Sequence, residues 1–186
     1  MRIRTHAFFG FGIEMLLLSW FKPAYLPELD KAFSLPTFAY DWLIADIVIA
    51  YVISLVINTS IDAAGHRMLG PTIRRRWQTH NVVTAPLRGA GFCLAAVATP
   101  SWLLGLAFPS EWILALWVSI MGATIGITHL FLDAFTPDGI FLTEHRKLHL
   151  GRVNGNGSAL NWAIIVVGIA IAIASVLLLD LHLIII

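Results

Sequence analysis

The chain contains five long apolar segments separated by shorter polar ones. They cover residues 3–20, 42–61, 89–108, 112–134 and 159–179. An α-helix rises about 1.5 Å per residue, so a hydrocarbon layer of about 30 Å requires about 20 apolar residues. The pattern therefore predicts an all-α fold: a polytopic membrane helix bundle of about five transmembrane helices, forming one domain over residues 1–186.

The composition agrees with this pattern. Hydrophobic residues make up 58% of the chain and charged residues 12%, whereas a soluble domain has about 25% charged residues. An integral cell membrane protein with lipids as partners is therefore expected, and nucleic acid is not an expected partner. The composition leaves open whether the chain forms a homo-oligomer or belongs to a larger membrane complex.

The basic residues lie almost entirely on one side of the five predicted spans. That side receives Arg2, Arg4, Arg67, Arg74, Arg75, Arg76, Arg88, Arg146, Lys147 and Arg152, and the other receives only Lys22 and Lys31. Lys and Arg are concentrated in cytoplasmic loops of membrane proteins. We therefore expect a cytoplasmic N-terminus, a C-terminus outside, and cytoplasmic loops at residues 62–88 and 135–158.

Polar residues recur at steps of four on three of the predicted helices, which places each set on one helix face. The sets are His129 with Asp133, preceded by Gly122 and Gly126; Asn58 with Asp62 and His66; and His6 with Gly10 and Glu14. Ionisable groups within a membrane are costly and often functional, and glycines let a neighbouring helix approach closely. A single acid at a helix end is more often a cap, but two His/Asp pairs near one membrane face favour a shared site.

Six of the seven histidines fall on the predicted cytoplasmic side. They are His6, His66, His80, His129, His145 and His149. Imidazoles and carboxylates contributed by several helices are typical ligands of Zn²⁺ or another divalent transition metal. Such an ion lowers the pKa of bound water and polarises a phosphoryl or acyl oxygen, so the pattern indicates metal-assisted chemistry.

Several motifs support a family resemblance that covers most of the chain. RTHAFF, NTSIDAAGHR, RRRWQTHNVVTAPLRG, ITHLFLDAFTPDGIF and HLGRVNGNGSALN, taken in order, resemble an archaeal family of small multi-spanning membrane proteins of unknown function. More distantly, HR…TH and G-x-x-x-H-x-x-x-D-x-x-T-P-x-G resemble bacterial inner-membrane proteins described as membrane-bound metal-dependent hydrolases. Here Ile125 stands at the glycine position of the second motif, and the bacterial Asp-x-Asp-His signature is absent.

The resemblance and the shared side together give a hydrolase hypothesis with named residues. We expect metal ligands or their partners at His6, Asp62, His66, His80, His129 and Asp133, and catalytic groups at Glu14, Asn58, His145 and His149. Arg76, Arg146 and Arg152 would bind a phosphate-containing substrate. The expected cofactor is a divalent metal, with zinc as the first choice.

Two non-hydrolytic functions compete with this hypothesis. In an accessory subunit of a membrane complex, the small-residue helix faces and basic loops would serve assembly, and the His/Asp pairs would be interhelical hydrogen bonds. A transporter ranks third, because the sequence contains no clear inverted repeat or pair of broken helices.

Overall fold

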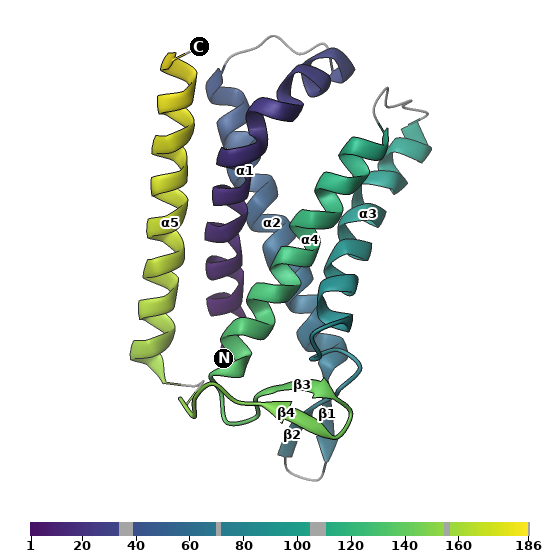
Figure 1. Ribbon diagram of the computed structural model, residues 1–186, viewed down its shortest axis with the longest axis vertical. Helices are drawn as coiled ribbons and strands as arrows, with labels where there is room; N and C mark the ends of the chain where they lie inside the picture. Colours follow the sequence, from purple (N-terminus) through teal and green to yellow (C-terminus); the bar gives the residue numbers. More distant parts are fainter. Residues whose placement is uncertain (34–38, 70–71, 105–110, 155–156, 186) are drawn as a thin grey trace.

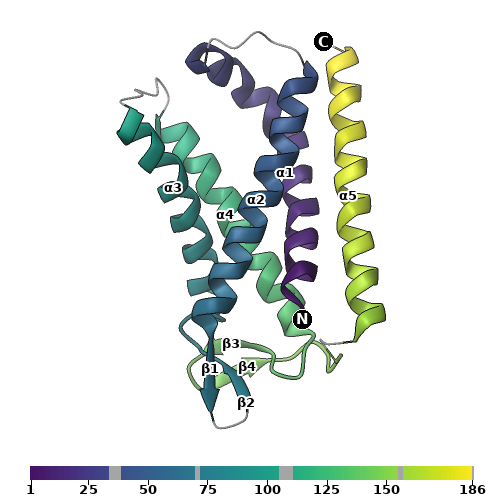
Figure 2. The same ribbon diagram turned by 180° about the vertical axis from the view of Figure 1, so that it is seen from behind.

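The computed structural model describes residues 1–33, 39–69, 72–104, 111–154 and 157–185. These residues form five helices, α1 (Ile3–Phe33), α2 (Ala39–Gly65), α3 (Thr84–Leu104), α4 (Glu111–Ala134) and α5 (Ser158–Ile185). The helices run side by side along the long axis of the molecule, with the N-terminus at one end and the C-terminus at the other (Figures 1 and 2). The expectation of a helix bundle is confirmed.

Three of the helices are long and apolar enough to cross a membrane, judged by length and composition. The qualifying segments are Asp46–Gly65 in α2, Ala115–Ala134 in α4 and Ala159–Leu178 in α5, within the described ranges. The expectation of five spans is thus supported for three helices only. Arg4, His6 and Glu14 lower the hydropathy of α1, and the end of the predicted span 89–108 lies outside the described residues.

Two short β-hairpins accompany the helices, so the all-α expectation is confirmed except for these strands. The first joins β1 (His66–Leu69) to β2 (Thr72–Arg75), and the second joins β3 (Ile140–Thr143) to β4 (Arg146–Leu148). Strands of three or four residues are too short to show a clear alternation in the sequence. Both hairpins lie beneath the helices, at the end that carries the N-terminus (Figure 1).

The second hairpin is joined through the backbone to the segment that follows the first. The Phe141 amide donates to the carbonyl oxygen of His80 at 2.8 Å, and the Val82 amide donates to the carbonyl oxygen of Phe141 at 3.3 Å. These bonds flank an isolated parallel bridge between Asn81 and Phe141. The segment that leads into α3 is therefore fixed against β3.

Glycines set the closest helix contacts. A Cβ atom on Gly122 of α4 would overlap the carbonyl group of Gly89 of α3, and Gly12 of α1 stands in the same relation to Gly168 of α5. Hydrocarbon tails are as apolar as the side chains, so helices in a membrane associate largely by such close packing. The predicted close approach of a neighbour to the Gly122 face of α4 is confirmed.

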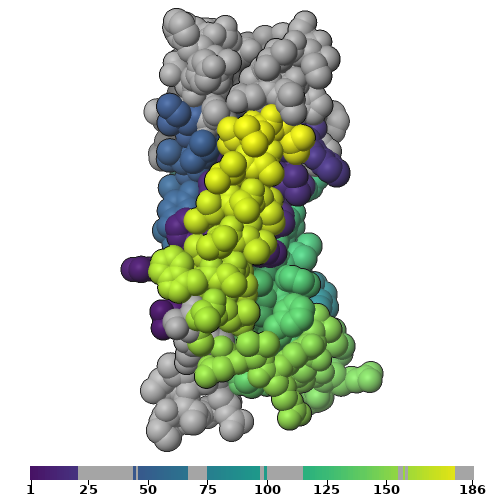
Figure 3. Space-filling view, turned by 90° about the vertical axis from the view of Figure 1, so that its left-hand side faces the viewer, coloured from purple at the N-terminus to yellow at the C-terminus, as the bar shows by residue number. Residues whose placement is uncertain are grey.

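The outer face of the bundle is apolar. In the view from the α5 side, α5 forms a ridge above the β3–β4 hairpin (Figure 3). Its exposed side chains include Val166, Ile173 and Leu177, and α2 exposes Val52 and Val56. Such a surface suits contact with lipid. Among the helix residues whose side chains the structure describes, His6, Glu14, His129 and Asp133 are buried inside the bundle.

Replacement of Gly122 by alanine should destabilise the α3–α4 pair. The added methyl group meets backbone rather than a movable side chain, and overpacking costs roughly 1–3 kcal/mol. We expect Gly122→Ala to lower the thermal midpoint in detergent. Gly91→Ala is the control, because a Cβ atom at Gly91 meets nothing within 4 Å; an equal loss in both variants would contradict the packing argument.

Candidate metal centre

Four side chains from three segments meet at the hairpin end of the bundle. Asp62 comes from the last turn of α2, His80 from the segment between β2 and α3, and His129 and Asp133 from successive turns of α4. We call these four residues the tetrad. His80, His129 and Asp133 are fully buried, and the side chain of Asp62 is 19% exposed.

The tetrad places two imidazole nitrogens against two carboxylates. His129 Nε2 lies 3.3 Å from Asp133 Oδ2 and 3.5 Å from Asp62 Oδ1. His80 Nε2 lies 3.6 Å from each of the same two oxygens. When zinc is bound tetrahedrally at about 2.0–2.1 Å from N and O ligands, those ligands are about 3.3–3.4 Å apart. The four measured nitrogen–oxygen distances, which would be edges of the tetrahedron, are close to that value.

The directions of these atoms also fit a metal. His80 Nε2, His129 Nε2 and Asp133 Oδ2 are buried and have no hydrogen-bond partner, although each nitrogen lies within 3.6 Å of that oxygen. Ligand lone pairs point to the centre of a coordination polyhedron rather than along its edges. Short distances without hydrogen-bond geometry are therefore expected of a ligand set. Two overlapping groups of three residues could hold a metal ion: Asp62 with His80 and His129, and His6 with His129 and Asp133.

Asn58 fixes the tautomer of His129. The Asn58 side-chain NH₂ group donates to the Ser54 carbonyl oxygen at 2.7 Å, so its amide oxygen faces His129 Nδ1 at 2.8 Å. An amide oxygen only accepts, which means that Nδ1 carries the proton and donates. The lone pair of the neutral ring is then on Nε2, directed toward Asp62 and Asp133, and such outer partners commonly orient metal-binding histidines.

Thr79 and Gly65 position His80 in a similar way. The Thr79 hydroxyl donates to the Arg76 carbonyl oxygen at 3.2 Å, so it accepts from His80 Nδ1 at 2.9 Å and leaves the Nε2 lone pair free. A Cβ atom on Gly65 would overlap the His80 ring, so the end of α2 must be glycine for the ring to fit. Burial lowers the pKa of His80, outweighing the opposite effect of Asp62; this favours the neutral ring that binds metals.

Asp133 is positioned through its other carboxylate oxygen, Oδ1. The Arg75 guanidinium donates to Asp133 Oδ1 at 2.6 Å, and His6 Nε2 lies 3.3 Å from the same oxygen. Arg75 also donates to the Thr136 hydroxyl at 2.8 Å and to the Gly139 carbonyl oxygen at 3.0 Å. A cation at the C-terminal end of a helix is favourable. Arg75 therefore fixes the end of α4 and turns Asp133 Oδ2 toward the two Nε2 atoms.

The other predicted ligands lie at the edge of the tetrad. The His6 ring stacks on that of His129 with 4.2 Å between centroids, and His6, His129 and Asp133 form a second possible metal group. His66 is 33% exposed, and its Nδ1 atom lies 2.7 Å from the Asp62 carbonyl oxygen. Neither group of possible ligands found among the described residues includes His66.

The predicted catalytic groups lie at different distances from the tetrad. Asn58 contacts His129. Glu14 is fully buried, without a partner for either carboxylate oxygen, and eight residues along α1 place it about 12 Å beyond His6. His145 and His149 are exposed, and neither takes part in the ion pairs of the tetrad that the structure describes. No contact among the described residues supports a catalytic role for His145 or His149.

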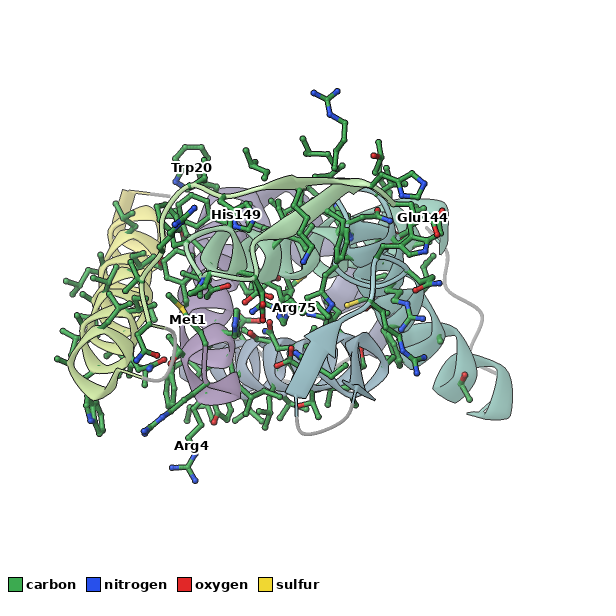
Figure 4. All side chains as sticks on the ribbon, turned by 90° about the horizontal axis from the view of Figure 1, so that it is seen from below. Met1, Arg4, Trp20, Arg75, Glu144 and His149 are labelled. Carbon is green, nitrogen blue, oxygen red and sulfur yellow. The ribbon has the colours of Figure 1, made fainter. Side chains whose placement is uncertain are left out.

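The predicted substrate-binding arginines are surface residues. Arg76, Arg146 and Arg152 are exposed at the hairpin end. In a view from below, Arg75 lies at the centre of the bundle, whereas Glu144 of the β3–β4 turn lies at its edge (Figure 4). Arg75, which the sequence pattern did not single out, is thus the arginine that enters the site. Alternation along β2 would separate it from its neighbours, but three consecutive arginines give no indication of which one faces inward.

No protein-family model, curated protein or solved structure matches this chain. The resemblance to the archaeal family and to the bacterial hydrolase-like proteins therefore stays a prediction. The functional assignment accordingly rests on the geometry of the tetrad.

Asn58→Leu should weaken metal binding without removing a ligand. The change leaves His129 Nδ1 without its acceptor, and loss of such an outer partner typically costs about 10–100-fold in metal affinity. Thr59→Val is the matched control, because the exposed Thr59 hydroxyl bonds only within its own helix, to the Leu55 carbonyl oxygen. The measurement is competitive titration of zinc against a chelating dye. Equal affinities in the two variants would show that Asn58 does not orient His129.

Proposed function

We propose that the protein is a membrane-embedded, metal-dependent hydrolase acting on a lipid or another phosphoester at the cytoplasmic face. The observation that carries the proposal is the tetrad, in which buried imidazole nitrogens and carboxylate oxygens face one another at ligand spacing. If a metal held there also bound a water as a fifth ligand, it would act as a Lewis acid and make that water acidic enough to ionise near neutral pH.

Zinc is the proposed metal. Two imidazoles and two carboxylates form a mixed nitrogen and oxygen set, and the edge lengths match tetrahedral coordination at zinc–ligand distances. Ca²⁺ and Mg²⁺ prefer oxygen ligands alone and about six or more of them. The two imidazoles therefore favour zinc or a neighbouring transition metal.

Asp62 marks the proposed approach for a substrate. It is the one member of the tetrad with a partly exposed side chain, and the His66 ring, one-third exposed, lies beside it. The other three members are sealed within the bundle. A substrate oxygen would therefore reach the centre past Asp62, while His80, His129 and Asp133 keep their orientation.

The charge at the hairpin end supports an anionic substrate. Arg76, Arg146 and Arg152 are exposed at the end of the bundle that carries the tetrad. Basic side chains at a membrane surface attract phosphate headgroups. We assign these arginines to the recognition of such a group at the membrane surface.

The proposed topology follows from the same charges. Five antiparallel helices would place both hairpins and the N-terminus on one side, as the arrangement in Figure 1 allows. We assign this side to the cytoplasm, because it carries most of the basic residues. The C-terminus of α5 is then outside, and α1 and α3 cross the membrane alongside the three apolar helices.

A non-catalytic accessory subunit is the second candidate. Four protein ligands complete a tetrahedral site, and closed sites of this kind are typically structural. In that case the ion would join α2, α4 and the segment before α3 without exposing a position to substrate. Assembly with other membrane proteins would then be the function of the small-residue helix faces.

His129→Ala and Asp133→Ala should each abolish metal content. Protein purified without chelator should contain zinc or a related ion by mass spectrometry, because the ligand atoms are preorganised by Asn58 and Arg75. His145→Ala and His149→Ala are the controls, since both side chains are exposed, and they should retain the ion. Metal-free wild-type protein would refute the proposal.

Hydrolysis separates the two candidate functions. Phospholipid or a chromogenic phosphoester in detergent should be cleaved by the wild-type protein, and cleavage should be lost after chelation and regained with zinc. A protein that binds zinc, loses thermal stability on chelation, and cleaves none of a panel of phosphoesters would instead support the accessory subunit.

A further inference from the structure

A second possible metal position lies on the Oδ1 side of Asp133, next to His6. His6, His129 and Asp133 supply three ligand atoms within 4.8 Å of one another, and all three residues are buried. His6 Nε2 lies 3.3 Å from Asp133 Oδ1, whereas the tetrad uses Oδ2 of the same carboxylate. In two-metal hydrolases the ions lie about 3.5–4 Å apart, a separation that one carboxylate can bridge. The residue types alone would thus allow two ions.

Arg75 already occupies that side. Its Nη2 atom lies 2.6 Å from Asp133 Oδ1, and its Nη1 atom donates to the Thr136 hydroxyl and the Gly139 carbonyl oxygen. The side chain is 6% exposed. The guanidinium keeps its positive charge at any pH at which the protein folds. A second cation on Oδ1 would therefore meet a fixed charge in the space it needs.

His129 imposes a further limit. Its Nδ1 atom donates to Asn58, so the neutral ring has one lone pair, on Nε2. That atom faces the tetrad through Asp62 Oδ1 and Asp133 Oδ2. One lone pair serves one ion, which means that both possible groups cannot be filled through His129 at once.

We propose that the protein holds one metal ion per chain, in the tetrad, and that Arg75 takes the place of a second ion. This proposal rests on the metal-dependent function proposed above and specifies the kind of centre. His6 is then a hydrogen-bond partner of Asp133 rather than a ligand. Arg75 is a positioning residue, since it acts on the ion through Asp133.

The stoichiometry of zinc binding tests the single-ion centre. Full-length protein in detergent is stripped of metal, titrated with zinc in a calorimeter, and freed of excess zinc by gel filtration before mass spectrometry. The wild-type protein and His6→Gln should each bind one zinc per chain. Two zinc ions in the wild-type protein, or loss of the ion in His6→Gln, would overturn the single-ion centre while leaving the hydrolase proposal intact. No zinc at all would refute the proposed function itself.

Removal of the guanidinium should open the second position. Arg75→Met should bind an additional, weaker zinc ion, whose ligands are His6 and Asp133 Oδ1 with solvent, and His6→Gln combined with Arg75→Met should return to one. Arg76→Met is the matched control, because the adjacent Arg76 is exposed, and it should bind one. Arg75→Lys keeps the charge and should also bind one.

A stable Arg75→Met protein that still binds a single zinc would overturn the role given to Arg75. Gel filtration and the thermal midpoint verify that each variant is folded. If Arg75→Met does not fold, the wild-type and His6→Gln stoichiometries still decide between one ion and two.

Discussion

The structure depends on a set of buried acceptor atoms that face one another. Two imidazole nitrogens, whose rings are already bonded through their other nitrogens to Asn58 and Thr79, point at two carboxylates between helices. Burying charge without a partner is far more costly than burying a polar group that is hydrogen-bonded. Arg75 offsets only one oxygen of Asp133. A cation shared by the remaining atoms would relieve the whole set.

The hairpins are best understood as supports of this set. The first delivers Arg75 to the end of α4, and the backbone of the second holds the segment that contains His80. Close packing serves the same end, because α3 reaches α4 at Gly122 and His80 reaches α2 at Gly65. The small non-helical part of the fold thus fixes side chains that the helices alone would not bring together.

The sequence was informative where periodicity applied and uninformative where the helix ended. The steps of four correctly placed His129 with Asp133 and Asn58 with Asp62. His66 continues the same spacing, but α2 ends at Gly65 and His66 starts β1. Its ring stays beside Asp62 and is one-third exposed, and His66 is in neither group of possible metal ligands among the described residues. The side-of-membrane argument likewise grouped His145 with the site, although that side chain is exposed in the turn of a hairpin. The side of the membrane on which a residue lies limits its depth in the bundle, but not the direction in which its side chain points.

The distribution of the ligands along the chain links metal binding to folding. Asp62, His80 and Asp133 belong to segments that lie far apart in sequence. An ion bound by all of them would join α2, α4 and the segment before α3 at one point. Binding free energy at such a site is also folding free energy, because the unfolded chain has no preformed site. The same geometry therefore supports both a catalytic and a structural metal, and the partly exposed Asp62 is the feature that favours catalysis.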